Sequence, residues 1–237
     1  MKSLVLGASG ATGKLVVQQL VQRKYHVRIV VREKANIPTQ FSEDKNIEII
    51  KGNIYDFNIE NIKNLLNDCD SLICCLGHNI SFKGIYGSPH KLVSVTVAKI
   101  IEALQELNTK PKFVLMSTTA YTNQKINEVN DLREKIVFSL LEVILPPHKD
   151  NMLAANQLVN KLGSKSEIEW VAVRPDSLFD EENVSQYEIQ NSKTRSAIFN
   201  PGKTSRINVS HFMAELVTNE NLWQQWKHKT PVIYNKE

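Results

Sequence analysis

Three glycines, Gly7, Gly10 and Gly13, lie three residues apart directly after an apolar run. In a strand–turn–helix unit the first suits a tight turn, the second lets backbone approach a phosphate, and the third lets the helix pack closely on the sheet. The N–H groups of the first helical turn then bind a diphosphate. Glycine triplets also occur in other turns, but here a helix and a second strand follow within about thirty residues. The spacing predicts a dinucleotide site on Gly7, Ala8, Ser9, Gly10, Ala11, Thr12 and Gly13.

The polar residues after the second apolar run indicate which dinucleotide fits this site. NAD-selective proteins place an acid there to bind the ribose 2'-hydroxyl, whereas this chain has Arg32, followed by Glu33 and Lys34. The planar guanidinium of an arginine suits a 2'-phosphate, and Glu33 points to the opposite side if the strand continues. The alternative is a solvated basic turn. We therefore expect NADP(H) rather than NAD as the cofactor.

Two further apolar runs end in residues that should line the same site. Asn53 and Ile54 follow the third run, and Leu76 and Gly77 end the fourth. Ligands of open parallel sheets bind beyond the carboxyl ends of the strands. Asn53 either bonds to the adenine edge or is a turn residue, and the sequence leaves both open.

Strand and helix patterns alternate along the chain and position these residues. Six short runs, rich in β-branched residues and apolar on both faces, predict strands covered by helices on two sides, at 3–7, 26–31, 46–50, 71–77, 112–117 and 169–175. Helical periodicity is found in 12–23, 58–66, 90–107, about 131–145 and 148–162. This alternation predicts an α/β fold with a doubly wound parallel sheet in a single domain over 1–237.

The tail and two irregular stretches complete this prediction. Residues 77–88 and about 176–205 form long polar excursions, and the tail offers a helix from about Ser210, a short second helix and a last strand. Pro146-Pro147 interrupts the helical pattern, so one helix should end near Leu145 and the next begin near His148. The apolar residues of the first of these helices cover either the sheet or a partner subunit: Ile136, Phe138, Leu140, Leu141 and Ile144.

Composition narrows the class of protein. The chain has 237 residues, 42% of them apolar and 23% charged, which excludes a disordered chain and a membrane span. A net charge of +4, with no basic block, does not indicate a nucleic-acid partner. The three cysteines Cys69, Cys74 and Cys75 show no metal-ligand spacing and predict buried reduced thiols. We expect no metal site and a cytoplasmic location, because no signal-peptide pattern precedes Gly7.

Beyond these patterns, the chain resembles the atypical short-chain dehydrogenase/reductase proteins, an NAD(P)-binding group that includes NmrA-like regulators and biliverdin/flavin reductase-like enzymes. The resemblance covers nearly the whole chain and rests on LGASGATG, VVRE, GNIYD, VLMSTTA, WVAVRP, PGKTSRINVSHFMAELV and the terminal PVIYN. It implies a Rossmann domain with a small C-terminal substrate lobe, to which about 176–210 contribute. It also makes Ser117 and Thr118 candidates for the nicotinamide side, Ser117 as both a catalytic and a cofactor-binding residue.

The chain departs from this family at the proton-relay pair. Active dehydrogenases of the superfamily carry Tyr-x-x-x-Lys on the helix after the fifth strand, where the lysine lowers the tyrosine pKa. The matching positions here are His148, Met152 and Asn156. His148 titrates near neutrality and is a candidate acid, or it simply lies at a helix start. Lys149 and Asp150 are expected to be helix-terminus charges, with Asp150 in the first turn.

Two other polar positions allow more than one interpretation. Tyr121 and Lys125 have the Tyr-x-x-x-Lys spacing, but they fall in a predicted loop four residues after Ser117, so we attribute the spacing to chance. Arg174 ends the sixth strand and either binds an anionic group or pairs with an acid such as Asp176.

These observations lead to two hypotheses from different classes. The first is an NADPH-dependent reductase of a small carbonyl, quinone or flavin-like acceptor, in which the loops from Gly77 and Asp176 form the rim and lid of the pocket. The second is a non-catalytic regulator that senses NADP, which the missing Tyr/Lys pair favours. A sugar-nucleotide epimerase needs that pair and ranks last. We expect a small-molecule substrate, a monomer or homodimer, and neither a nucleic-acid nor a membrane partner.

Overall fold

The computed structural model describes residues 1–78, 87, 89–144 and 146–236. These residues form an eight-stranded sheet in the order β3-β2-β1-β4-β5-β6-β10-β8. Its parallel strands are β1 (Lys2–Leu6), β2 (His26–Val31), β3 (Ile47–Lys51), β4 (Ser71–Cys74), β5 (Lys112–Met116), β6 (Trp170–Pro175) and β10 (Val232–Asn235). At one edge β8 (Tyr187–Gln190) pairs antiparallel with β10. The predicted doubly wound parallel sheet of the Rossmann type is confirmed, and this edge strand extends it.

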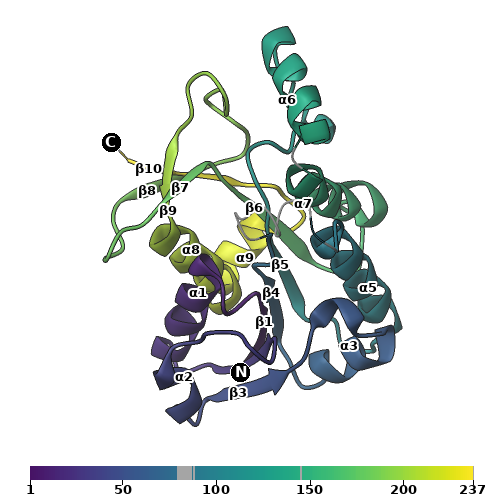
Figure 1. The fold of residues 1–237 in the computed structure, drawn as a ribbon, viewed down its shortest axis with the longest axis vertical. Coiled ribbons are helices and arrows are strands. Elements are labelled where there is room, and N and C mark those ends of the chain that lie inside the picture. The colour runs from purple at the N-terminus through teal and green to yellow at the C-terminus, as the bar shows by residue number, and fades with distance from the viewer. Residues whose placement is uncertain (79–86, 88, 145, 237) are drawn as a thin grey trace.

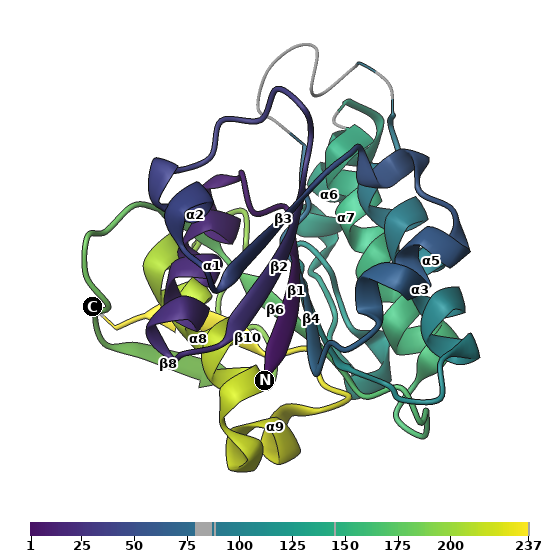
Figure 2. The same cartoon turned by 90° about the horizontal axis from the view of Figure 1, so that it is seen from below.

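Helices cover both faces of the sheet, as Figures 1 and 2 show. On one face α1 (Ala11–Gln22), α8 (Arg206–Thr218) and α9 (Glu220–Trp226) bury an apolar core against the strands. On the other face α3 (Ile59–Leu66), α5 (Leu92–Glu106) and α7 (Pro146–Asn156) bury a second core. The short α2 (Thr39–Glu43) adds Phe41 to the first core. The strands are therefore apolar on both faces because each face meets helices.

Helix α6 (Leu132–Ile144) differs from the covering helices because it extends away from the sheet (Figure 1). Phe138 is buried, but Leu132, Ile136 and Leu140 are 73%, 63% and 58% exposed. These three residues recur every four positions and form one solvent-facing stripe. The sequence left open whether these residues cover the sheet or a partner subunit, and the exposure of Ile136 and Leu140 argues against the sheet.

The C-terminal third holds short strands that the sequence did not predict. β7 (Ser177–Phe179) pairs with β9 (Lys203–Ser205) in a separate two-stranded sheet. The helix expected from Ser210 begins four residues earlier, at Arg206, because the Ser205 hydroxyl accepts a hydrogen bond from the Asn208 N–H and caps α8. These strands lie within the segment, around 176–210, for which we expect a small C-terminal lobe.

Three further points concern the predicted helices and thiols. The predicted helix 148–162 begins at Pro146 and passes into the π-helical η3 (Gln157–Leu162). All three cysteines are free and buried, as expected, and burial raises the pKa of Cys69 to about 11 and that of Cys74 to about 12. Among the described helices, none combines the length and apolar character needed to cross a bilayer.

Candidate functional site

A cavity of about 480 Å³ opens at the carboxyl ends of β1, β2, β3 and β4. It is lined by eight of the residues that the sequence predicted for a cofactor: Gly7, Ser9, Gly10, Arg32, Asn53, Ile54, Leu76 and Gly77. The other members of the glycine segment, Ala8, Ala11, Thr12 and Gly13, belong to the same turn and helix start but do not line the cavity. Segments far apart in sequence thus converge on one crevice, as a doubly wound sheet requires.

The glycine turn leaves the start of α1 open to this cavity. Gly7 has a φ of +80°, and a Cβ there would lie 2.5 Å from the Cys75 carbonyl oxygen. A Cβ on Gly13 would overlap the Gly7 carbonyl, so the helix packs on the strand only without a side chain. Gly10 is the N-cap of α1, where no side chain caps the helix and no acidic residue occupies the first turn. The uncapped N–H groups and the positive end of the helix dipole fit a diphosphate.

Arg32 marks the end of the cavity that lies over β2. Its side chain is exposed, and the described residues offer its guanidinium no hydrogen bond or ion pair. None of the described lining residues is acidic, and Glu33 is exposed outside the lining. This end therefore presents a cation where an NAD-selective site presents a carboxylate. The arrangement fits a dinucleotide that carries a 2'-phosphate.

Asn53 lines the cavity, but its amide already has partners. The side-chain oxygen accepts a hydrogen bond from the Tyr55 N–H at 3.4 Å, and the side-chain nitrogen donates to Asp56 at 2.9 Å. Asn53 thereby caps η1 (Ile54–Asp56). Of the two interpretations that the sequence left open, these contacts favour the turn residue.

Ser117 lies directly after β5 and outside the lining of the cavity. The residue is 8% exposed, and its Oγ has no hydrogen-bond partner within the described part of the chain. An unpartnered buried hydroxyl costs stability unless something else binds it. Its neighbour Thr118 accepts a hydrogen bond from the Ala120 N–H through Oγ1.

Tyr121 and Lys125 do not form the proton-relay pair that is missing from α7. Burial raises the pKa of Tyr121 to about 12, the opposite of what a proton-relay tyrosine needs. Lys125 lies on the short η2 (Gln124–Ile126). Of the matched positions on α7, Met152 and Asn156 line another cavity, of about 280 Å³. His148 belongs to α7, but its side chain lies outside what the structure describes.

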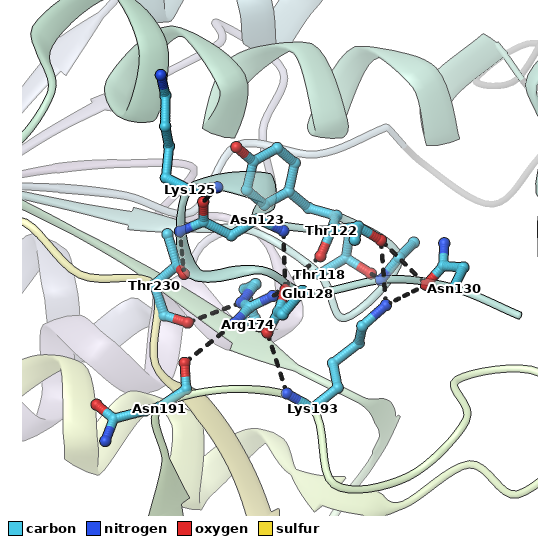
Figure 3. Close-up of polar contacts among 12 residues, drawn as sticks. Thr118, Thr122, Asn123, Lys125, Glu128, Asn130, Arg174, Asn191, Lys193 and Thr230 are labelled. Carbon is cyan, nitrogen blue, oxygen red and sulfur yellow. Dashed lines mark hydrogen bonds and ion pairs between the residues drawn. The ribbon is translucent and has the colours of Figure 1, made fainter.

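Arg174 is fully buried at the end of β6 (Figure 3). Of the two alternatives that the sequence left open, it pairs with an acid, and this acid is Glu128 rather than the suggested Asp176. Its two terminal nitrogens donate to the Glu128 carboxylate at 2.6 and 2.8 Å, and its Nε donates to the Thr230 carbonyl. Burial opposes ionisation of Glu128, but the hydrogen bonds from Arg174 outweigh it and lower the pKa of that carboxyl. Arg174 is therefore a structural residue and has no group left for an anionic ligand.

A second charged group stands beside the same network. Lys193, from the loop that follows β8, donates its Nζ to Thr122 at 3.1 Å and to Asn130 at 2.6 Å (Figure 3). Burial lowers the pKa of Lys193. These bonds join the segment after β8 to the loop that precedes α6.

Sequence reasoning missed one pair at the cavity. His78 lines the cavity, and its Nε2 lies 2.9 Å from a carboxylate oxygen of Asp150. We expected Asp150 in the first turn of its own helix, but it lies beyond that turn. Its carboxylate instead accepts hydrogen bonds from the N–H groups of Val93 and Ser94 at the start of α5. The two partners are 72 residues apart, so no local pattern joins them.

Comparison with known proteins agrees with this geometry. A family model described as NAD(P)H-binding matches residues 7–220. A curated relative, an uncharacterised chloroplastic protein of Arabidopsis thaliana, is 26% identical over 177 residues, which are 75% of this chain. The match spans 59% of the length of that relative.

Solved structures with the same fold extend over nearly the whole chain. An oxidoreductase of Lactococcus lactis has a TM-score of 0.72 at 18% identity, covering 100% of this chain and 92% of its own. A Veillonella parvula short-chain dehydrogenase/reductase in complex with NADP has a TM-score of 0.70 at 16% identity, covering 99% and 94%. ChuY, an anaerobillin reductase of Escherichia coli O157:H7, has a TM-score of 0.69 at 14% identity, covering 100% and 98%. With a family model over most of its length and a Rossmann-type sheet beneath the glycine turn, the chain belongs to the NAD(P)H-binding family.

Proposed function

We propose that the protein is an NADPH-dependent reductase of a small carbonyl, quinone or flavin-like acceptor. The observation that carries the proposal is the pairing of two features in one cavity. The uncapped start of α1 lines this cavity through Gly10, and Arg32, with no described partner, lines it after β2. The first feature suits a diphosphate and the second suits the extra phosphate of NADPH.

Each group has a definite task in this proposal. The N–H groups after Gly10 hold the diphosphate, and Arg32 binds the 2'-phosphate. When bound, NADPH supplies a hydride. The orphan Ser117 hydroxyl, which follows β5, is suited to donate a hydrogen bond on the nicotinamide side. The chain's main contribution is to hold donor and acceptor in reacting geometry and to keep water out.

The similar structures support this class of reaction. The protein from Lactococcus lactis is an oxidoreductase, the one from Escherichia coli an anaerobillin reductase, and the one from Veillonella parvula was solved with NADP. At 14–18% identity they share the fold with this chain, and a common fold hosts many activities. They therefore support reduction by a nicotinamide cofactor and leave the acceptor to be determined by experiment.

A second candidate is a regulator that binds NADP without turnover. It is favoured by α7, where Met152 takes the place of the lysine that would acidify a tyrosine, and by the raised pKa of Tyr121. NADPH absorbance, followed with FMN, menadione and an aromatic aldehyde as acceptors, separates the two candidates. Turnover that falls in Ser117→Ala supports the reductase, whereas tight NADPH binding without turnover on the whole panel supports the regulator.

The cofactor assignment is tested by Arg32→Asp, with Lys34→Asp as the matched control. Both variants change the charge by the same amount, but Lys34 does not line the cavity. We expect Arg32→Asp to weaken NADPH relative to NADH by about 10- to 150-fold, the 1.5–3 kcal/mol of a hydrogen bond to a charged group. Lys34→Asp should change that ratio by less than about threefold. Equal weakening of both cofactors in Arg32→Asp, measured by fluorescence titration, would reject the 2'-phosphate assignment.

Location and assembly complete the proposal. We propose that the protein acts in the cytoplasm on a small-molecule substrate, as a monomer or homodimer and as a single domain. Size-exclusion chromatography with light scattering measures the oligomeric state directly.

A further inference from the structure

The reductase proposed above needs a proton as well as a hydride, and the tyrosine–lysine pair that usually delivers it is missing. The structure offers another titratable side chain at the cavity. His78 follows β4 and belongs to the cavity lining, and its side chain is 5% exposed. A histidine changes protonation near neutral pH and is the commonest general acid in enzymes.

Asp150 fixes the orientation of this histidine. The Asp150 side chain is 1% exposed and binds His78 Nε2 at 2.9 Å. Its carboxylate also accepts the Val93 N–H at 2.7 Å, and the N–H and hydroxyl of Ser94. Burial opposes the charge on Asp150, but the hydrogen bonds from His78 and Ser94 outweigh burial and lower the pKa of that carboxyl.

An ionised carboxylate accepts hydrogen bonds but donates none, so His78 Nε2 is the donor in this pair. The ring proton that can leave is then the one on Nδ1, present when the imidazole is cationic. The bond to Asp150 holds the ring in one orientation, just as a buried carboxylate orients the histidine of a catalytic triad. The pair therefore has the chemistry of an acid that is held in one orientation.

The order of the strands places His78 on the nicotinamide half of the site. The diphosphate position lies at β1, and Arg32 marks the adenosine half at β2. A dinucleotide that spans the switch point continues on the other side of β1, which is β4. His78 is the fourth residue after that strand.

We propose that His78, oriented by Asp150, is the general acid of the reductase. The inference rests on the proposed function. The acceptor carbon gains the hydride and the carbonyl π bond breaks, so that its electron pair moves to oxygen. That oxygen takes the Nδ1 proton of His78, the carbonyl compound is reduced to the alcohol, and NADPH is oxidised to NADP⁺. With a quinone, one carbonyl oxygen takes the hydride, the electron pair passes through the ring to the other oxygen, and that oxygen takes the Nδ1 proton to give the hydroquinone. Neutral His78 keeps its Nε2 bond to Asp150 and regains a proton from water.

The first test compares His78→Gln with His90→Gln, a matched control because His90 is an exposed histidine close in sequence. With NADPH and menadione or an aromatic aldehyde, we expect His78→Gln to lower kcat by roughly 100-fold or more. The dissociation constant of NADPH should stay within about twofold, and His90→Gln should match the unchanged protein. An unchanged kcat in His78→Gln would overturn the proposal, and so would a loss of NADPH affinity as large as the loss of kcat.

The second test detects the hydrogen bond between His78 and Asp150 by NMR and does not depend on catalytic turnover. In the unchanged protein, NMR should show a downfield imidazole N–H signal from the bond between His78 and Asp150, absent in His78→Gln and moved upfield in Asp150→Asn. Titration with NADPH should shift the His78 ring signals, whereas 2',5'-ADP, which lacks the nicotinamide half, should leave them in place. Equal shifts with both ligands would place His78 on the adenosine half and overturn the proposal, even if His78→Gln fails to fold.

These outcomes separate the two levels of the proposal. A protein that binds NADPH but reduces none of the acceptors rejects the reductase, and the acid is rejected with it. A protein that turns over equally well with and without His78 keeps the reductase and rejects the acid.

Discussion

Two arginines stand at strand ends in this fold, and their surroundings differ in kind. Arg32, after β2, is exposed at a cavity and has no partner among the described residues. Arg174, at the end of β6, is fully buried and donates to a carboxylate and to backbone carbonyls. The same residue type thus serves two purposes, because a guanidinium binds a ligand only with donors that the fold leaves unpaired.

The same contrast holds for the regions around the two arginines. Around Arg32 the chain presents bare backbone N–H groups, small residues and a cavity of about 480 Å³. Around Arg174, the polar groups of Glu128, Lys193 and Thr122 bind one another (Figure 3). The first region therefore has the capacity to bind a ligand, and the second joins the segment after β8 to the loop that precedes α6.

The strongest test of this contrast is Arg174→Met. Removal of one partner leaves the Glu128 carboxylate buried without its counter-charge, so we expect the free energy of unfolding to fall by about 3–5 kcal/mol. Denaturation by urea measures the loss, and the double variant Arg174→Met with Glu128→Gln should lose less than the sum of the single variants. The folded fraction should bind NADPH within about twofold of the unchanged protein. A stable Arg174→Met variant that has lost NADPH would assign Arg174 to the binding region instead.

Local sequence patterns predicted residues that the structure brings together at one cavity, but they missed contacts between segments far apart in the sequence. The glycine turn, Arg32 and the ends of β1 to β4 lie within short segments whose spacing carries the signal. Arg174 and Glu128 are 46 residues apart, and only the folded chain brings them together. For Arg174 the sequence therefore left the partner open, and the acid it suggested, Asp176, was the wrong one.

Some strands and helix boundaries were also missed by the sequence patterns, because they depend on contacts that only the folded chain makes. Strands β7 and β9 have three residues each, too few for an alternation to be recognised, and each exists because it pairs with the other. The start of α8 did carry a local signal, since Ser205 is a capping residue. On α6, Ile136 and Leu140 show that an apolar helical stripe does not by itself predict burial.

A smaller effect is expected from acid on Glu128. Its pKa is lowered in the folded protein, so the unfolded chain binds the proton more tightly. The stabilisation is complete above the ordinary glutamate value of 4.5 and is lost as the pH falls through the lower folded value. We expect Glu128→Gln to cost about 1.5–3 kcal/mol at neutral pH, from weakened charged hydrogen bonds. Urea denaturation at decreasing pH should show a shallower loss of stability in Glu128→Gln than in the unchanged protein, whereas parallel slopes would show that Glu128 does not carry the acid sensitivity.

The smallest effect is expected at Asn53. This residue lines the same cavity as Arg32, but its side-chain amide is hydrogen-bonded within the chain, as the polar groups around Arg174 are. Its amide bonds to Tyr55 and Asp56, so little hydrogen-bonding capacity remains for an adenine. We expect Asn53→Ala to lower stability by about 0.5–1 kcal/mol, through loss of the cap on η1, and to change NADPH affinity by less than about twofold. Isothermal titration beside Arg32→Asp tests this. If Asn53→Ala lowers NADPH affinity as strongly as Arg32→Asp does, the adenine must displace the hydrogen bonds of Asn53 to Tyr55 and Asp56. Hydrogen bonding within the chain would then not distinguish the cavity residues that bind the cofactor from those that do not.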